Sequence, residues 1–243
     1  MAYGVRLMVW GDYASFNRPE MKVERVSYDV MTPSAARGIL EAIYWKPQMA
    51  WVIDAIHVLS PVRFTYVRRN EISSKIPSKG HTGAGNAMKS GRGNLGINVA
   101  DPSQRQQRAA MILCDVRYGI KAHIEVRKNT DSEGLLMNHP EAKHLDSFRR
   151  RAMRGQCFHR PYLGTREFPA SFQWVKEFPG CPEELRGERE LGYMLHDIEY
   201  QADPKGSVIE ANKGTRLNAC PRFFRAKLVD GVLDVPPLQA TRA

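Results

Sequence analysis

The sequence predicts an α+β fold built on an antiparallel sheet, and two observations lead to this prediction. Several segments alternate apolar and polar side chains with a period of two residues, as half-buried strands do. Two other segments place apolar side chains at helical spacing between capping signals. Apolar residues make up 42% of the 243 residues, which is enough for one large domain, or for one domain with a smaller one beside it.

A strand followed by a helix opens the chain. Residues 4–10 alternate apolar and polar side chains and predict a strand. After a polar connection, Thr32 can act as the N-cap of a helix, with Pro33 at the first helical position. The apolar side chains then recur at helical spacing, at Ala36, Ile39, Leu40 and Ile43. Pro47 disfavours continuation of the helix, so residues 44–46 are expected at its exit.

Residues 51–67 and 106–127 predict two long strands that pair as an extended hairpin. Residues 51–67 are rich in β-branched and aromatic residues, and Pro61 is expected at a bulge or an edge position. The connection between them, residues 72–98, has six glycines and four basic side chains, Lys75, Lys79, Lys89 and Arg92. A loop of this length is either functional or disordered. It could be a flexible surface insertion or a basic flap that becomes ordered on a phosphate backbone.

A second helix is expected to begin after Asn138 as its N-cap, with Pro140 near its start and Gly155 at its exit. Its last turns hold four arginines, at positions 149, 150, 151 and 154. Part of this positive charge suits the negative end of the helix dipole. Four arginines are more than a cap requires.

The elements so far follow the order strand, helix, strand, strand, helix, which is five sixths of a ferredoxin-like βαββαβ unit. The alternating residues 190–201 are expected to supply the sixth strand, and residues 208–235 further short strands with a turn at Asp230 and Gly231. We therefore expect a ferredoxin-like domain in residues 1–165, with a basic β-hairpin insertion at about 72–98. Residues 166–243 would then hold the final strand and a small antiparallel β domain.

The charge of the chain favours an anionic partner. Lys and Arg number 36 against 26 Asp and Glu, a net charge of +10, which suits nucleic acid or an acidic membrane surface. Residues 68–108 hold eight Lys or Arg against two acids, and residues 143–166 hold seven against one. A uniformly basic, solvated surface does not predict this concentration.

The four cysteines, at positions 114, 157, 181 and 220, are scattered without the close spacing of structural zinc ligands. The first strand follows no secretory signal pattern, and no apolar run approaches the length of a membrane span. We expect a reduced, cytoplasmic protein that needs no structural metal.

Lys121 and His123 alternate onto the polar face of their strand, roughly 7 Å apart at a rise of about 3.3 Å per residue. RNA carries its own nucleophile, the 2′-hydroxyl, so an RNase can work without metal. A lysine supplies fixed positive charge, and a histidine exchanges a proton near neutral pH. Tyr44 can act as a base only if neighbouring cations lower the pKa of its phenol; otherwise it can orient the 2′-hydroxyl. We predict that these three side chains surround one phosphate.

Each of the three residues also has a structural interpretation. A tyrosine at a helix exit often packs at the edge of the core, and a lysine and a histidine on one strand are often its solvated face. Metal ligation has less support, because His139 and His144 are five residues apart and do not align on a helix.

Four long motifs resemble a known family. They are GDYASF at residues 11–16, TPSAARGILEAIYWKP at 32–47, YGIKAHIEV at 118–126 and GQCFHRPYLGTREFPASF at 155–172. They are similar to the CRISPR-associated repeat-processing protein of type I-C Cascade, which is the fifth Cas family in its subtype with a C-terminal extension, within the RAMP superfamily.

The resemblance implies an RRM-like ferredoxin domain with a small C-terminal β domain. It implies metal-independent cutting of the repeat hairpin in precursor CRISPR RNA, without a cofactor, and retention of the 5′ handle in the Cascade surveillance complex. The implied partners are the backbone and large subunits of Cascade and, through the complex, target DNA. The implied catalytic residues are Tyr44, Lys121 and His123, although Arg117 or Arg127 could take the place of the lysine.

An inactive subunit that only holds the 5′ handle is the alternative, because many relatives in other subtypes do this. A DNA-cutting enzyme would need acidic metal ligands, since DNA lacks the 2′-hydroxyl. In either RNA-binding reading, the side chains expected to contact RNA are Arg37, Trp45, Lys46, Lys75, Lys79, Lys89, Arg92, Arg149, Arg150, Arg151 and Arg154.

Overall fold

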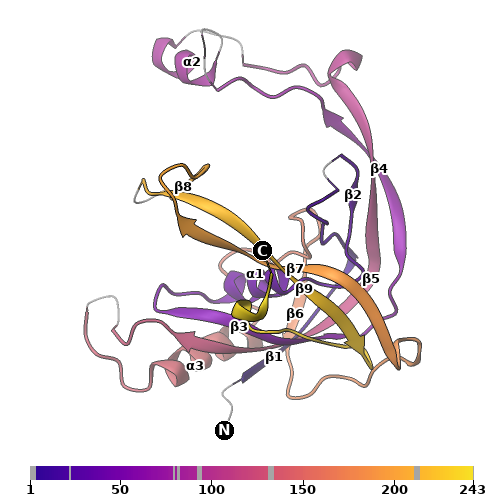
Figure 1. Ribbon diagram of the computed structural model, residues 1–243, viewed down its shortest axis with the longest axis vertical. Coiled ribbons are helices and arrows are strands. Elements are labelled where there is room, and N and C mark those ends of the chain that lie inside the picture. The colour runs from indigo at the N-terminus through magenta and orange to yellow at the C-terminus, as the bar shows by residue number, and fades with distance from the viewer. Residues whose placement is uncertain are drawn as a thin grey trace.

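The computed structural model describes residues 4–21, 23–78, 80, 83–91, 95–130, 134–210 and 214–242. Within these residues the strands form one sheet of ten strands (Figure 1). The strand order along its main path is β6-β1-β5-β3-β10-β9-β7, while β2 and β4 also pair with β5, and β8 pairs with β9. The chain is therefore α+β with a large sheet in which all neighbouring strands are antiparallel except β2 and β5.

The described strands are β1 (Gly4–Ala14), β2 (Arg25–Val26), β3 (Met49–Val58), β4 (Phe64–Ile72), β5 (Arg105–Val126), β6 (Ser171–Trp174), β7 (Glu188–Ala202), β8 (Val208–Ile209), β9 (Arg216–Val229) and β10 (Val232–Asp234). The helices are α1 (Pro33–Ile43), α2 (Ala84–Ser90) and α3 (Pro140–Met153). Short 3₁₀ turns lie at Pro102–Gln104, Glu183–Leu185 and Leu238–Ala240.

The predicted start of α1 is confirmed. Thr32 is the N-cap, its hydroxyl oxygen accepts a hydrogen bond from the backbone N–H of Ala35, and Pro33 is the first helical residue. The helix ends at Ile43, and Tyr44 follows as an extended C-cap. β1 continues past its predicted end to Ala14, because Gly11 and the residues after it still pair with β5.

Helices α1 and α3 pack on one face of the sheet and form the main hydrophobic core with it. Ile39 and Ile43 of α1, Phe148 of α3 and Ile120 of β5 are all buried in one cluster. The ring of Phe148 meets that of Trp51 of β3 edge-on, with 4.7 Å between ring centroids. The core fixes which face of β5 each residue occupies, because a one-residue slip would turn every side chain to the other face.

The predicted hairpin of two long strands is present, with one change. β5 runs almost as expected, but residues 51–67 divide into β3 and β4, with Pro61 in the break between them. β3 pairs with residues 118–126 of β5, and β4 pairs with residues 105–113. A proline cannot donate to a strand ladder, so the break falls where the sequence has no donor.

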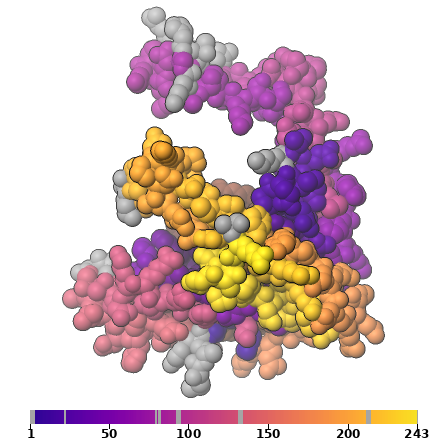
Figure 2. Space-filling model, viewed as in Figure 1, coloured from indigo at the N-terminus to yellow at the C-terminus, as the bar shows by residue number. Residues whose placement is uncertain are grey.

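β4 and the first half of β5 extend from the body of the molecule as an arm, with α2 at its far end (Figure 1). The space-filling view shows open space between the end of this arm and the part of the molecule around β8 (Figure 2). α2 buries none of its residues. The described residues of the predicted loop, 72–78, 80, 83–91 and 95–98, therefore lie at the end of the arm, and they include the short helix α2.

The prediction for the sixth strand is wrong. Residues 190–201 lie in β7, which pairs with β9, whereas the strand beside β1 is β6. β6 has four residues, too few to show a clear period. It pairs with residues 7–10 of β1, which are distant in sequence. β7 has the longer alternating pattern, but it pairs with β9 and not with β1.

The predicted second helix is present as α3, but its cap is different. His139, with φ of 51°, is the N-cap residue instead of Asn138, and its side chain makes no capping hydrogen bond. Pro140 is the first helical residue, as expected, and Gly155 follows the helix with a positive φ of 65°.

The turn predicted at Asp230 and Gly231 is confirmed. Asp230 and Gly231 both have positive φ, 45° and 73°, and join β9 to β10. This is the backbone geometry of a two-residue hairpin turn, which glycine and aspartate tolerate best. β10 also pairs with β3, so the C-terminal strands continue the sheet of the N-terminal part.

Candidate functional site

Lys121 and His123 lie on the face of β5 that points away from α1 and α3. Ile120, Ala122 and Ile124, which alternate with them, are buried in the core under the helices. Because side chains alternate along a strand, Lys121 and His123 project from the opposite face. Lys121 is exposed, and the side chain of His123 is 40% exposed. We call this surface of the sheet the open face.

Asp54 of β3 is the hydrogen-bond partner of His123. Its Oδ1 lies 2.7 Å from Nδ1 of His123. An ionised carboxylate can only accept, so Nδ1–H of the imidazole donates and Nε2 is left for proton exchange. Asp54 sits at a shift of register between Ile53 and Ala55, where β3 carries one extra residue against β5. Such a bulge can redirect one side chain.

Arg6 of β1 completes a cationic pair on the open face. Its backbone lies directly opposite Lys121 in the β1–β5 ladder, while Gly4 lies opposite His123 and adds no side chain there. Two like charges facing each other across a sheet destabilise it. In the described part of the chain neither cation has a carboxylate within ion-pair distance; Arg6 donates only to the backbone oxygen of Lys176. An anion between the two cations would relieve this repulsion.

The ring of Phe178 limits the open face on one side. It lies over Gly119 of β5, where any Cβ would come within 2.6 Å of it, and it packs against His57 with 4.6 Å between ring centroids. Burial lowers the pKa of His57, and the positive charge of Lys121 lowers it further. His57 is thus held neutral beside the cations.

Tyr44 lies on the other side of the sheet. It is only 6% exposed and belongs to the core cluster, and its backbone oxygen accepts from the indole Nε1–H of Trp51. Its hydroxyl lies 2.8 Å from Nδ1 of His144 on α3. Among the described residues no hydrogen bond or ion pair joins Tyr44 to Lys121 or His123. The expectation that the three surround one phosphate is not met, because the sheet separates them.

Of the two roles considered for Tyr44, that of a base is disfavoured, because the pKa of its phenol is not lowered. Burial raises the pKa of its phenol, and this exceeds the opposing effects of a hydrogen bond from Ser147 and of the nearby cations Arg151 and Arg150. The guanidinium of Arg151 lies 5.3 Å from the centre of the phenol ring and donates to the backbone oxygen of Ile43. Tyr44 therefore stays protonated and can act as a hydrogen-bond donor.

Tyr44 lines a cavity of about 540 Å³ between the exit of α1 and the helix α3. Four basic residues also line it, Lys46, Lys143, Arg150 and Arg151. We call it the basic pocket. Arg150 and Arg151, two of the four arginines predicted in the last turns of the second helix, are therefore here. Of the others, Arg149 lies with its guanidinium 5.8 Å from the ring centre of Trp174, and Arg154 caps the end of α3.

Two further predicted RNA contacts differ in their surroundings. Arg37 is ion-paired with Asp197 of β7 at 2.9 Å and with Glu41 at 3.9 Å, so its charge already serves to hold α1 against β7. Trp45 is 52% exposed and does not cover the core. An exposed indole of this kind can stack on an unpaired base.

The basic residues predicted in the flap are only partly placed. Lys75 and Lys89 are exposed near the end of the arm. Lys79 and Arg92 lie outside the described residues.

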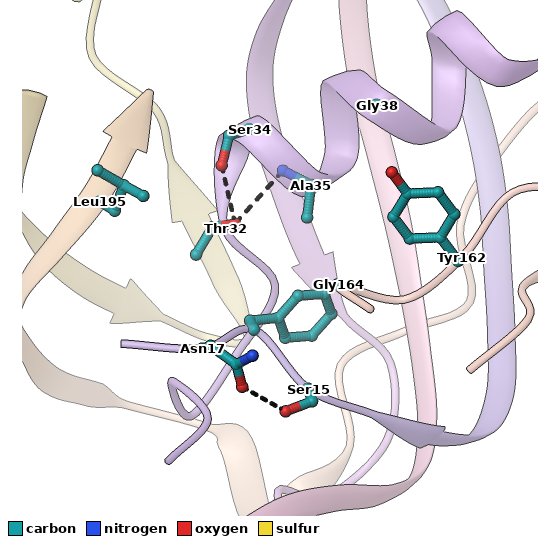
Figure 3. A pocket seen from close by; sticks show the side chains of 10 residues that line it. Ser15, Asn17, Thr32, Ser34, Ala35, Gly38, Tyr162, Gly164 and Leu195 are labelled. Carbon is teal, nitrogen blue, oxygen red and sulfur yellow. Dashed lines mark hydrogen bonds between the residues drawn. The ribbon is translucent and has the colours of Figure 1, made fainter. Parts of the chain in front are cut away.

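A second, smaller cavity of about 300 Å³ lies at the start of α1 (Figure 3). Its lining is neutral, and several of its polar groups bond to one another: Ser15 donates to Asn17, and Thr32 accepts from Ala35 and bonds to Ser34. None of the side chains predicted to carry chemistry lines this cavity. The basic pocket, in contrast, is lined by Tyr44 and by basic side chains predicted to contact RNA.

The sequence did not lead us to Asp54, Arg6 or His144. Asp54 is a charged residue inside a run of apolar ones, Trp51 to Val58, and that break in the pattern was a usable signal. Arg6 alternates with buried residues of β1, as any solvated residue would. His144 lies four residues before the buried Phe148, so it shares the apolar stripe of α3.

Among the described residues no group of three or more His, Cys, Asp and Glu side chains is placed to hold a metal ion. None of the helices that the structure describes is long and apolar enough to span a membrane.

The sequence matches the family model for Cas5d, described as CRISPR-associated protein (Cas_Cas5), over residues 4–236. The chain belongs to the Cas5d family. It is 48% identical over 244 residues to the CRISPR pre-crRNA endoribonuclease Cas5d of Mannheimia succiniciproducens, with 99% of this chain and 98% of that protein covered. It is 38% identical over 237 residues to the protein of the same name from Thermus thermophilus, with 96% and 91% covered.

Solved structures agree with this fold. A functionally uncharacterized protein from Streptococcus mutans superposes with a TM-score of 0.65 at 20% identity, covering 100% of this chain and 96% of that one. A CRISPR-associated protein superposes with a TM-score of 0.61 at 20% identity, with the same coverage. At this identity the likeness shows that the Cas5d chain shares their fold.

Proposed function

We propose that this chain is a sequence-specific endoribonuclease that cleaves the repeat hairpin of precursor CRISPR RNA. The near full-length relatives in Mannheimia and Thermus are named for this activity, at 48% and 38% identity. The observation that carries the proposal here is the hydrogen bond between His123 and Asp54 on the open face, beside Lys121 and Arg6, which form no ion pair with any described residue.

The open face can supply each part of a metal-independent cleavage. RNA brings the nucleophile as its 2′-hydroxyl. His123, oriented by Asp54, exchanges a proton through Nε2, and Lys121 and Arg6 stabilise the charge that develops on the phosphate. The imidazole is accessible enough to reach a substrate, and its hydrogen bond to Asp54 fixes the direction in which Nε2 points.

Tyr44 contacts the same RNA from the helix side. Its phenol and the cations of the basic pocket would hold the chain of the substrate, while Lys121 and His123 act at the phosphate that is cut. The first residues of β3, 49–53, have no described strand on the edge away from β5, since β10 pairs only with residues 55–57. An RNA strand can therefore pass around this edge between the two surfaces.

The fold we propose is a ferredoxin-like, RRM-like unit made of β1, α1, β3, β5, α3 and β6, followed by a small β domain made of β7 to β10. The strand order β6-β1-β5-β3, with two helices on one face, supports this assignment. The proposed boundary lies near residue 165, with β6 as the final strand that returns to the first unit.

The arm and the helix exit would supply further contacts to the RNA backbone. The exposed lysines Lys75 and Lys89 would meet it at the arm, and Trp45 would stack on an unpaired base. After cleavage the chain would keep the 5′ handle as a subunit of Cascade, beside the backbone and large subunits and, through them, target DNA.

The test is to incubate the protein with its repeat RNA in EDTA, beside RNAs with a single 2′-deoxy sugar at each candidate position. Cleavage at one position that survives EDTA and stops with the 2′-deoxy sugar is the expected result. Cleavage that requires a divalent ion would overturn the metal-independent mechanism. Tight binding with no product in any condition would mean an inactive subunit that holds the 5′ handle.

A further inference from the structure

The loop that follows α3 carries a row of rings that the proposed cleavage does not use. Phe158 is 87% exposed, and its ring centroid lies 6.2 Å from that of His159. The ring of His159 in turn stacks on that of Tyr162, with 6.3 Å between the centroids and 23° between the ring planes. We call Phe158, His159 and Tyr162 the aromatic row. None of the three lines the basic pocket.

The backbone that carries the aromatic row is fixed at both ends. The backbone N–H of Phe158 donates to the backbone oxygen of Ala42 in α1 at 2.8 Å. Just beyond Tyr162, the side chain of Leu163 is fully buried, and its backbone oxygen accepts from the N–H of Ser15 at 3.0 Å. The fold therefore holds the Phe158 ring in water. Contact with a partner would recover the stabilisation that burial of the ring would give.

The charges around the aromatic row are positive. Residues 153–166 contain no Asp or Glu and three exposed arginines, at positions 154, 160 and 166. None of the three arginines forms an ion pair with a described residue. The guanidinium of Arg166 lies 6.0 Å from the centre of the Tyr162 ring. Exposed rings beside arginines without counter-ions suit a single-stranded nucleic acid, because bases stack on the rings and the cations attract the backbone.

We propose that Phe158 stacks on an unpaired base of the RNA beside its hairpin, and that the exposed arginines next to the aromatic row hold the backbone of this segment. Every base has a π face, so the contact adds affinity and helps to place the hairpin whatever the base is. The identity of the nucleic acid as RNA rests on the proposed function. The existence of a site for a single strand on this loop does not.

The experiment measures binding and not cleavage, with a repeat RNA that carries 2′-deoxy sugars and so cannot be cut. We expect Phe158→Ala to weaken binding by about 5- to 150-fold, the range for the loss of one stack between a base and an aromatic ring. Phe158→Trp should bind as the wild type does. Tyr200→Ala, at an exposed tyrosine of β7, is the matched control and should also bind normally. Wild-type affinity in Phe158→Ala, or an equal loss in Tyr200→Ala, would overturn the proposal.

The salt dependence of binding tests the arginines separately from the ring. The phenyl group carries no charge, so Phe158→Ala should leave the slope of log affinity against log salt unchanged. Arg160→Gln should lower that slope by about 1, the value for one lost phosphate contact. A wild-type slope in Arg160→Gln would overturn the part of the proposal that concerns the backbone.

An abasic sugar in the RNA separates stacking from a structural role of Phe158. It removes one base but leaves the phosphate, and it is placed at each unpaired position in turn. At one position we expect the wild-type protein to lose as much affinity as Phe158→Ala loses on the unmodified RNA, and the variant to lose nothing more there. Losses that add at every unpaired position, in a variant that melts as the wild type does, would mean that Phe158 only supports the loop.

Further outcomes separate this proposal from its alternatives. If single-stranded DNA of the same sequence binds as tightly and depends equally on Phe158, the site stands and its assignment to RNA is overturned. If Phe158→Ala binds RNA normally but no longer joins the other Cascade subunits, the aromatic row is a protein interface and the proposal is overturned. If wild-type protein cuts no RNA but its binding depends on Phe158, the proposed cleavage fails and the aromatic row stands. If it cuts RNA and Phe158→Ala binds normally, the reverse holds.

Discussion

Two histidines on opposite faces of the same sheet are each bonded through Nδ1, but to different partners. His123 on the open face bonds to the carboxylate of Asp54 at 2.7 Å. His144 in the basic pocket bonds to the phenol of Tyr44 at 2.8 Å. The side chain of His123 is 40% exposed, and His144 is 4% exposed.

The difference in partner determines what each imidazole can do. The carboxylate of Asp54 holds the imidazole of His123 through Nδ1 and leaves Nε2 to exchange a proton during a reaction. His144 has a neutral partner, lysines nearby and little water, and each of these disfavours a positive charge on the ring. The open face therefore presents an accessible imidazole, whereas the basic pocket holds a buried, neutral one among cations.

The largest effect should come from removing the open-face imidazole. His123→Ala is expected to slow cleavage of the repeat RNA by about 10²- to 10⁴-fold, because general acid–base catalysis contributes that much. The affinity for uncleavable RNA should stay near the wild-type value. Single-turnover rates and binding of a 2′-deoxy RNA measure the two quantities separately. If His144→Asn instead had the larger effect on the cleavage step, the roles that we give to the two histidines would be reversed.

Asp54→Asn should have the next largest effect. A hydrogen bond to a charged group contributes about 1.5–3 kcal/mol, so we expect cleavage to slow by about tenfold to a hundredfold. Single-turnover rates measure this loss, and the affinity for a 2′-deoxy RNA should stay near the wild-type value. A wild-type rate in a folded variant would mean that Asp54 only braces the bulge in β3.

The candidate site was only half predictable from the sequence, for a reason that these residues make clear. The alternation of β5 gave the correct face to Lys121 and His123, because period two is a local property. Asp54 and Arg6 reach them through cross-strand pairing and a bulge, which depend on register. The sequence placed Tyr44 correctly at the helix exit. The side of the sheet on which its ring packs depends on α3, because its hydroxyl bonds to His144, one hundred residues later.

The fold shows the same division between local and distant causes. The cap of α1 at Thr32 and the turn at Asp230 and Gly231 were predictable, since each depends on a few neighbouring residues. The sixth strand was not, because β6 has only four residues and is ordered by pairing with β1. The stronger periodic signal in residues 190–201 belongs to a strand that pairs elsewhere.

Arg6→Gln should have a smaller effect than Asp54→Asn, and on the rate of cleavage more than on affinity. The guanidinium is exposed, and exposed ion pairs contribute only about 0.2–1 kcal/mol, so we expect cleavage to slow by about two- to fivefold. Higher salt should reduce the difference. Arg225→Gln is the matched control, because Arg225 is an exposed arginine that is already ion-paired with Glu190 on the C-terminal strands. A loss of rate in both variants would indicate a general charge effect.

The smallest expected effect is on stability, and it concerns the other histidine. Because the folded protein holds the pKa of His144 below its ordinary value of about 6.5, the unfolded chain binds a proton there more readily as the pH falls below that value. The free energy of unfolding should therefore decrease as the pH falls below about 6.5. His57 and His196, whose pKa values burial also lowers, act in the same direction. Urea unfolding of wild type and His144→Asn across this range isolates one residue: the variant should lose less stability than the wild type as the pH falls. Parallel curves would mean that His144 is not held neutral in the folded protein, and the contrast with His123 would then lose its electrostatic basis.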